Sequence, residues 1–331
     1  MTTPTATADH ESLDRRIVAA LQVDGRASWK TIATVLQQPE RTVARKGQAL
    51  LESRTVRVSG LSLSGEGVVV RVACAPGMSR VAAHALSVRG DTTFVYITTG
   101  SSDVVAEFIC PLPRLASLLM DELAAIPGVR ESSAAPVARY FKPMDLWQPG
   151  ILSAGEERAL RGDLPSEVPQ GEIPHPALTK DDRLMLRVLA EDGRATFEEI
   201  GRLVGVSEAT ARRRVGWMRQ NLAVTIRAVV EPAVLGLPVE TLMWLTVDPS
   251  NVEPLGRGLV GVPSVRYAAG LLGSHQMLID SAHPTLSEAY RFMTDIGAAS
   301  DGIRSIETAL VTKAVKRGGL VMAAAPSLPE G

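Results

Sequence analysis

The sequence has very few of the residues that build metal centres and cross-links. Cys74 and Cys110 are its only cysteines among 331 residues, which excludes both a disulfide framework and a zinc site made of CxxC pairs. The five histidines are scattered at positions 10, 84, 175, 275 and 283, and neither His275 nor His283 has a second ligand at metal spacing. We therefore expect no metal, no cofactor and no catalytic residues, and a surface role for His275 and His283.

Long apolar runs are also missing. No stretch approaches the ~20 apolar residues that a helix needs to cross a bilayer, and residues 1–12 lack the apolar core of a signal peptide. A hydrophobic content of 45% still fits a compact soluble protein, and the length predicts roughly two domains at about 150 residues each. The expectation is a cytoplasmic protein with no membrane partner.

An excess of positive charge is the third absence, because 35 basic and 36 acidic side chains give a net charge of −1. This balance at first argues against nucleic acid. Phosphate contacts, however, require only a local basic face. The sequence contains such a face just after residue 207, where arginines cluster behind an acidic stretch.

Residues 178–221 have the pattern of three short helices. Thr196 and Glu199 form a capping box that starts the second helix, Gly205 permits the left-handed turn that ends it, and Ser207 caps the third. Ala211, Val215 and Met218 are expected to pack inward. Two helices joined by a glycine turn, with cations on the second, are typical of a helix-turn-helix that reads double-stranded DNA.

The third helix supplies the candidate DNA contacts. Its first turn is expected to face base edges through Glu208, Ala209 and Arg212, while Arg213, Arg214 and Arg219 are expected on the exposed side as phosphate contacts. The complete predicted set in this copy is Ser207, Glu208, Ala209, Thr210, Arg212, Arg213, Arg214 and Arg219.

An internal repeat links the two halves of the chain. The sequence DGRAS at 24–28 recurs as DGRAT at 192–196, and matching residues extend over almost forty positions. The first copy has Gln37-Gln38-Pro39 in place of the glycine turn and carries fewer cations. We therefore expect the second copy to dominate binding, with weaker contacts from Glu40, Arg41, Thr42, Arg45 and Lys46.

Each helix-turn-helix is followed by a short β-branched strand, at 55–59 and 225–229, and then by a βαββαβ pattern. In the first half the expected helices are 78–88 and 113–126, and the expected last strand is 129–141. This order predicts an α+β protein with duplicated ferredoxin-like domains. The expected units are tail 1–12, helix-turn-helix domains 13–60 and 178–230, ferredoxin-like domains 61–142 and 231–317, a Pro-rich linker 143–177 and tail 318–331, with Trp147 and Leu152 apolar enough to pack on a domain.

A helix-turn-helix that contains DGRAT, ends in an arginine-rich helix and precedes a βαββαβ domain resembles the Lrp/AsnC transcription regulators. The glycines of the two hairpins, Gly100 and Gly273, strengthen the resemblance. It implies a ligand-sensing (RAM) module in each half, pairing of these modules within one chain as in a fused dimer, and further self-association. It also implies an amino-acid-like effector bound near the hairpin loop, at Gly100, Ser101, Ser102, Asp103 and Gly273. Gln276 replaces the acidic residue of the second loop, so effector binding is expected in the first module.

Two other functions stay open at this point. Sirohaem decarboxylases share the same architecture, but their chemistry needs clustered basic side chains including histidines, which are scattered here. A small-molecule binder whose DNA-reading units have decayed is the second alternative, and the weaker first copy keeps it open for that half. Asp280 lies in the middle of a predicted strand, where an exposed sheet face or an interface ion pair is the expected setting.

Overall fold

The computed structural model describes residues 12–62, 65–165, 176–299 and 302–322. The expected N-terminal tail up to residue 11 and residues 323–331 of the expected C-terminal tail lie outside this part. In both halves the three predicted helices form, each begun by a polar side-chain cap or a proline. They are α1 (Leu13–Val23), α2 (Trp29–Leu36) and α3 (Glu40–Glu52), then α7 (Lys180–Glu191), α8 (Phe197–Val204) and α9 (Glu208–Gln220).

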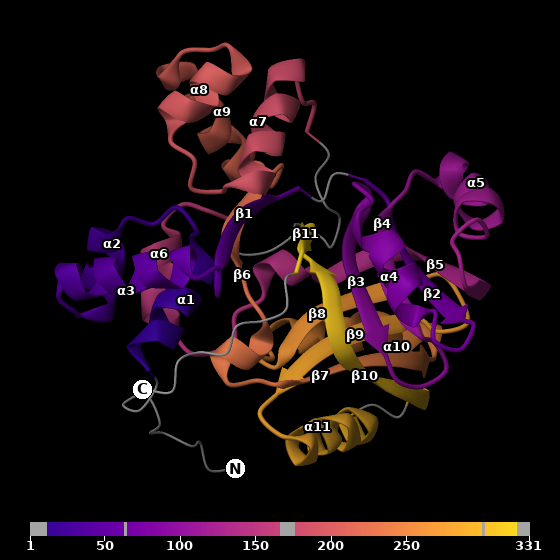
Figure 1. Cartoon of the computed structure of the whole chain (residues 1–331). Coiled ribbons are helices and arrows are strands. Elements are labelled where there is room, and N and C mark those ends of the chain that lie inside the picture. The colour runs from indigo at the N-terminus through magenta and orange to yellow at the C-terminus, as the bar shows by residue number, and fades with distance from the viewer. Residues whose placement is uncertain (1–11, 63–64, 166–175, 300–301, 323–331) are drawn as a thin grey trace.

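The strands that follow the two helix-turn-helix units pair with each other. Strand β1 (Arg57–Leu61) runs antiparallel to β6 (Thr225–Val229), with Ser59 opposite Arg227. Figure 1 shows the resulting ribbon between the helical bundle α1–α3 and the bundle α7–α9. These strands therefore link the two DNA-binding units, which are far apart in the sequence.

The two predicted βαββαβ patterns close into one barrel. The first supplies β2 (Gly67–Cys74), β3 (Thr92–Thr98), β4 (Val104–Ile109) and β5 (Val129–Lys142), and the second supplies β7 (Val239–Val247), β8 (Val265–Leu271), β9 (Met277–His283) and β10 (Ile303–Arg317). The last strand of each module pairs with the second strand of the other, β5 with β8 and β10 with β3. The expected pairing of the two modules within one chain is confirmed, and it occurs edge to edge.

Helices cover the outside of this barrel (Figure 1). They are α4 (Ser79–Ser87), α10 (Pro249–Val260) and α11 (Leu286–Ala299). The prediction of one regular helix over 113–126 is wrong. The segment is a 3₁₀ turn (Leu112–Arg114), a single α turn labelled α5 (Leu115–Ser117) and a π turn (Leu118–Glu122). The π turn places Leu118 and Leu123, five residues apart, on the same buried side.

Aromatic side chains fill the interior of the barrel. Phe94 stacks on Tyr96 with 4.7 Å between ring centroids, and the edge of Tyr267 meets both Phe94 and Tyr140 at about 6 Å. Trp244 is buried in the same cluster. Because residues alternate between the two faces of a strand, the other face packs separately under the outer helices.

The predicted linker 143–177 is only partly a linker. After a 3₁₀ turn at Met144–Leu146, helix α6 (Ala154–Arg161) begins with a capping box between Ser153 and Glu156. Trp147, Leu152 and Leu160 are buried in the core of the first helix-turn-helix domain. Burial of these apolar side chains orders the segment despite its prolines. Residues 166–175 lie outside the described part.

The C-terminal end also departs from the expected tail. Strand β11 (Leu320–Val321) turns back on β10 across Gly318 and Gly319, both with positive φ. A 3₁₀ turn at Pro232–Leu235 precedes β7. Among the described residues, no helix combines the length and hydropathy that a membrane span requires.

Candidate nucleic-acid interface

Helix α9 is fixed at its start by the residues that the sequence indicated. The Oγ of Ser207 accepts a hydrogen bond from the Thr210 amide at 3.2 Å. Gly205 ends α8 with φ of 83°, a conformation that glycine adopts without strain. Ala211, Val215 and Met218 are buried, as predicted. The first turn of α9 is therefore rigidly placed on its domain.

The exposed side of α9 carries most of the predicted contacts. Ser207, Glu208 and Ala209 are exposed, Thr210 is half-buried, and Arg212 and Arg213 point into solvent. The Arg212 guanidinium donates to Glu208 Oε1 at 2.6 Å and lies 4.6 Å from the centre of the Phe197 ring. This exposed pair is worth little in water, so breaking it costs Arg212 little.

The expectation that Arg214 and Arg219 are exposed is wrong. Arg214 donates to both oxygens of Asp182, at 2.8 and 2.5 Å, and Asp182 is completely buried. The hydrogen bonds from Arg214 lower the pKa of Asp182 to about 2. Arg219 forms an ion pair with Asp24 of the other helix-turn-helix unit. Arg214 thus holds α9 to α7 within the second unit, and Arg219 holds α9 to the first unit, because an acidic residue faces each of them.

The first copy presents a similar but less well-capped helix. Arg41 and Arg45 of α3 are exposed, Glu40 is exposed and Thr42 is half-buried. Lys46 donates to Asp14 at 2.9 Å, in the position that Arg214 occupies in the second copy. Pro39 provides no side-chain cap for α3, and Gln37 adopts the left-handed conformation with φ of 54°. Each recognition helix therefore offers two exposed arginines.

A reciprocal arginine clasp joins the two copies. Arg26 donates to the carbonyl oxygens of Gly193 and Ala195 at 2.7 and 2.9 Å. Arg194 donates to Gly25 O at 2.6 Å and to Ala27 O at 3.2 Å. We call these two side chains and their acceptors the arginine clasp. Burial, followed by the neighbouring Arg219 and Arg194, lowers the pKa of Arg26 to about 10, so the clasp remains charged at neutral pH.

Glycine is required next to each clasp arginine. A Cβ on Gly25 would lie 2.7 Å from a Val58 methyl group and 2.8 Å from the Arg227 backbone. A Cβ on Gly193 would meet Ile226 and Val58 at 2.9 Å. The amides of both glycines donate into the β1–β6 ribbon, at 2.9 Å each. The repeated DGRA motif thus serves the contact between the copies, a role that sequence reasoning missed although the repeat itself was the signal.

The predicted effector loop lies at the seam between the two barrel halves. A Cβ on Gly100 would lie 3.7 Å from the Ala309 Cβ of β10, and a Cβ on Gly273 would lie 3.2 Å from the Ala135 Cβ of β5. Ser101 is exposed and hydrogen-bonds with Arg71 and Glu307, whereas Ser102 is buried.

Asp103 contacts the backbone of its own module. Its carboxylate accepts from the Cys74 amide at 2.7 Å and from Ser79 Oγ at 3.3 Å. Gln276 makes the equivalent contact with the Val247 amide at 3.0 Å. An acid and an amide therefore hold the same strand end in the two modules, which accounts for both residues without a ligand.

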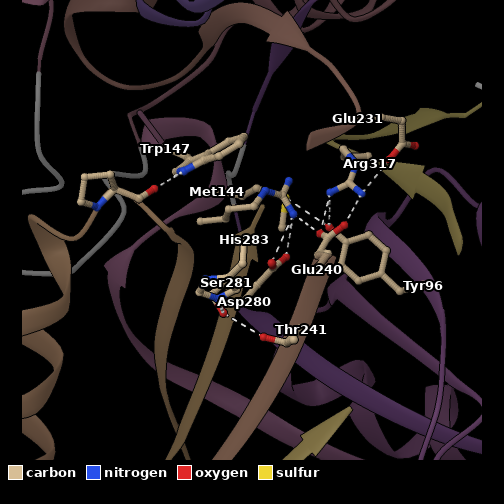
Figure 2. Close-up of polar contacts among 12 residues, drawn as sticks. Tyr96, Met144, Trp147, Glu231, Glu240, Thr241, Asp280, Ser281, His283 and Arg317 are labelled. Atoms are coloured by element: carbon tan, nitrogen blue, oxygen red, sulfur yellow. Dashed lines mark hydrogen bonds and ion pairs between the residues drawn. The ribbon is translucent and has the colours of Figure 1, made fainter. Parts of the chain in front are cut away.

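The strand residue Asp280 lies in a fully buried charge network, shown in Figure 2. Arg266 Nη1 donates to Asp280 Oδ2 at 3.0 Å and also contacts Glu240, and Arg317 donates to Glu240 Oε2 at 2.7 Å. Burial raises the pKa of Asp280, whereas at Glu240 the effect of burial is outweighed by Arg266 and Arg317, which lower its pKa. Of the two settings expected for Asp280, the ion pair is confirmed and the exposed face is not.

The expectation of a surface position is wrong for His283. Its ring is buried at the end of β9, 3.0 Å from Ser281 Oγ and against the Phe292 ring. His275 is half-buried, 3.5 Å from Glu307. Among the described residues no group of histidine, cysteine and acidic side chains is arranged to hold a metal ion.

The model of the AsnC-type helix-turn-helix domain matches residues 12–50 and 178–219. A helix-turn-helix transcriptional regulator of Pyrococcus abyssi is 32% identical over 142 residues, which cover 43% of this chain and 90% of that protein. This chain belongs to the Lrp/AsnC family. A regulator of P. abyssi named FL11 is 23% identical over 42% of this chain and 93% of its own length. Each of these relatives therefore matches less than half of this double-length Lrp/AsnC chain.

The fold of this Lrp/AsnC protein also occurs in a solved structure that matches it along most of its length. The crystal structure of the sirohaem decarboxylase NirDL aligns with a TM-score of 0.59, over 92% of each chain and at 12% identity. This similarity shows a shared architecture. The duplicated arrangement of helix-turn-helix units and ferredoxin-like domains is thus confirmed.

Proposed function

We propose that this Lrp/AsnC regulator reads an asymmetric pair of DNA half-sites with α3 and α9 of one chain. The observation that supports this proposal most directly is the arginine clasp, which joins the two units that carry the different recognition helices. Arg41 and Arg45 of α3 and Arg212 and Arg213 of α9 are the exposed cations of these helices. Their neighbours differ, because α3 begins with Pro39-Glu40 and α9 begins with Ser207-Glu208-Ala209. Different side chains on base edges prefer different bases, by about 1–3 kcal/mol for a good contact.

Footprinting with systematically exchanged half-sites tests this proposal. The preferred site should consist of two unlike half-sites, and exchanging one for a copy of the other should reduce affinity. Pairing of two chains would restore a dyad at a larger spacing. A short perfect palindrome that binds best with one chain per site would contradict the proposal.

The second helix-turn-helix should contribute more to affinity than the first. Its advantage lies in the Ser207 cap and the unstrained Gly205 turn. The two additional arginines, Arg214 and Arg219, are not part of this advantage because they are engaged in ion pairs. The double variant Arg212→Ala/Arg213→Ala should abolish specific binding, and Arg41→Ala/Arg45→Ala should weaken it. Equal losses in a gel-shift titration would refute this ranking. If the four exposed arginines each neutralise one phosphate, the slope of log affinity against log salt should be about −3.6.

The effector is proposed to be a small, amino-acid-like molecule. If it binds at the hairpin loop, Asp103→Ala should abolish an effector-induced rise in melting temperature and Gln276→Ala should preserve it. The backbone contacts of Asp103 also make Asp103→Asn a necessary variant, because asparagine retains an acceptor for the Cys74 amide. A rise that persists in Asp103→Ala and disappears in Gln276→Ala would reverse the assignment.

The protein is proposed to have no catalytic activity. The arrangement of the described histidines supports this. His84 is exposed on α4, His275 lies in the β8–β9 hairpin and His283 is buried under Phe292, so they form no common basic cluster. The purified protein should be colourless and should leave added sirohaem unchanged in its absorption spectrum. Decarboxylation of sirohaem would overturn the proposal in favour of the enzyme with the same architecture.

A further inference from the structure

A cavity of about 250 Å³ lies where the β1–β6 ribbon and α7 meet the barrel. We call it the barrel-mouth cavity. Its wall combines Leu61 of β1, Leu186 and Ala190 of α7, and Leu320 of β11 with barrel residues that include Phe94 and Glu107. Figure 1 shows β11 between the β1–β6 ribbon and β3. An occupant of this cavity would touch both the DNA-binding unit and the sensing barrel.

Among its described lining residues, the barrel-mouth cavity has three carboxylates, Asp91, Glu107 and Asp145, and one cation, Lys316. Glu107 is buried on β4 and accepts hydrogen bonds from Thr93 Oγ1 at 2.5 Å, Tyr267 OH at 2.7 Å and Tyr140 OH at 3.1 Å. A carboxylate offers about four acceptor positions, so these three hydroxyl donors leave one open. Burial raises the pKa of Glu107 despite these donors, and a nearby positive charge would favour its ionised form.

A second acidic side chain in the wall lacks part of its hydrogen bonding. Asp145 is 9% exposed, and its Oδ1 has no hydrogen-bond partner among the described residues. The cation of the cavity, Lys316, is already engaged, because its Nζ donates to Arg89 O and Thr92 Oγ1. Asp91 is held by Arg89 and Arg114. Arg227 already offsets part of the Asp145 charge, so the open acceptor position of Glu107 is the one that a positively charged hydrogen-bond donor would fill.

In the duplicated half, protein side chains fill the corresponding place. Glu107 pairs across its sheet with Val69, and Asp280 pairs in the same register with Leu242. Beside Asp280 the guanidinium of Arg266 takes the place that corresponds to Thr93, and Trp147 lies over it at 4.9 Å. Only about 20 Å³ remains open there.

The two helix-turn-helix units also differ in how much of the neighbouring space they fill. Gln22 is buried in the wall of the filled half, whereas the repeat places Ala190 at the corresponding position of the open half. Arginine, tryptophan and glutamine side chains thus occupy one half. Threonine and alanine leave the other half open around an acidic group.

We propose that the barrel-mouth cavity binds a small organic amine, with its protonated nitrogen at Glu107 and its apolar body against Leu61, Leu186 and Leu320. Such a ligand supplies the missing donor and covers the apolar wall. Because α7 and β1 form part of the wall, binding fixes the DNA-binding unit relative to the barrel. This last consequence rests on the proposed DNA-reading function, whereas the binding itself does not.

Calorimetric titration of the full chain at neutral pH tests the site. The probes are benzylamine, 2-phenylethylamine, cyclohexylamine and 3-methylbutylamine, with 3-phenylpropionate as an anion of similar body. At least one amine should bind and raise the melting temperature, and the anion should not. Loss of the charge-assisted hydrogen bond in Glu107→Gln should weaken amine binding about tenfold or more. Failure of all four amines to bind, or equal binding of 3-phenylpropionate, would refute the proposal.

Two further variants separate the site from general destabilisation. Ala190→Gln introduces the side chain of the filled half and should block the amine, whereas the matched control Gln22→Ala alters the other half and should leave amine affinity unchanged. Loss of binding in Gln22→Ala but not in Ala190→Gln would place the ligand elsewhere and overturn the assignment.

Operator affinity measured with and without the bound amine tests the coupling. A change in affinity supports it. An amine that binds through Glu107 without changing operator affinity retains the site and refutes the coupling. A protein that fails to bind DNA under any condition refutes the proposed function and leaves the calorimetric result intact.

Discussion

Removal of one arginine of the clasp should loosen both DNA-binding units together. In Arg194→Ala the carbonyl oxygens of Gly25 and Ala27 lose charged donors, and the Trp29 ring loses a guanidinium 4.7 Å from its centre. Hydrogen bonds to a charged group contribute about 1.5–3 kcal/mol and an exposed cation–π contact about 0.5–1 kcal/mol. Because Arg194 is half-buried, we expect a loss of about 2–3 kcal/mol.

Thermal unfolding followed by calorimetry measures this loss. For a unit of about 100 residues, which is the combined length of the two helix-turn-helix domains, 1 kcal/mol corresponds to about 4–8 °C, so the transition that contains this pair should fall by about 8–24 °C. The barrel transition should change little. Arg26→Ala should behave similarly, since its guanidinium makes the reciprocal contacts and lies 4.4 Å from the Phe197 ring.

The double variant distinguishes a clasp from two independent contacts. Once one arginine is removed, the second holds a contact that is already weakened, so the combined loss should be smaller than the sum by at least about 0.5 kcal/mol. Both single variants should also lower affinity for the two-half-site operator more than for an isolated half-site. Strictly additive losses, or single losses below about 0.5 kcal/mol, would show that the clasp does not hold the two units together.

Two further predictions concern the individual helix-turn-helix units. The pKa of Asp182 is lowered in the folded state, so the Arg214 pair stabilises the fold above about pH 4, and this contribution is lost as the pH falls towards 2. Asp182→Asn should therefore lower the free energy of unfolding by about 2 kcal/mol at neutral pH and flatten the acid side of a calorimetric plot of melting temperature against pH. Asp14→Asn, which removes a more exposed ion pair, should have a smaller effect. Gly205 has a φ of 83°, so Gly205→Ala should lower the free energy of unfolding, measured in urea, by about 1–2 kcal/mol. Gln37 has a φ of 54°, so Gln37→Gly should stabilise the first copy. Changes in the free energy of unfolding with the same sign for both variants would contradict the left-handed assignment.

The sequence by itself determined the local elements, because their signals lie within a few residues. Thr196 with Glu199, Gly205 and Ser207 define the ends of α8 and α9 through backbone hydrogen bonds that these residues satisfy on their own. The βαββαβ order likewise indicated the strands that form the barrel, and the repeated DGRA motif revealed the duplication. The family resemblance depended on these same local patterns.

Only the tertiary structure decided which arginines are exposed. Arg212 and Arg214 are two residues apart on one helix, and what distinguishes them is the buried Asp182 on α7 that faces Arg214. A helical pattern cannot register a partner thirty-two positions away. The same holds for Trp147, whose burial turned part of an expected linker into core, and for Glu107, whose neighbours Tyr140 and Tyr267 come from strands of both modules. Contacts between the duplicated halves depend on how the barrel closes, and that closure is a property of the whole chain.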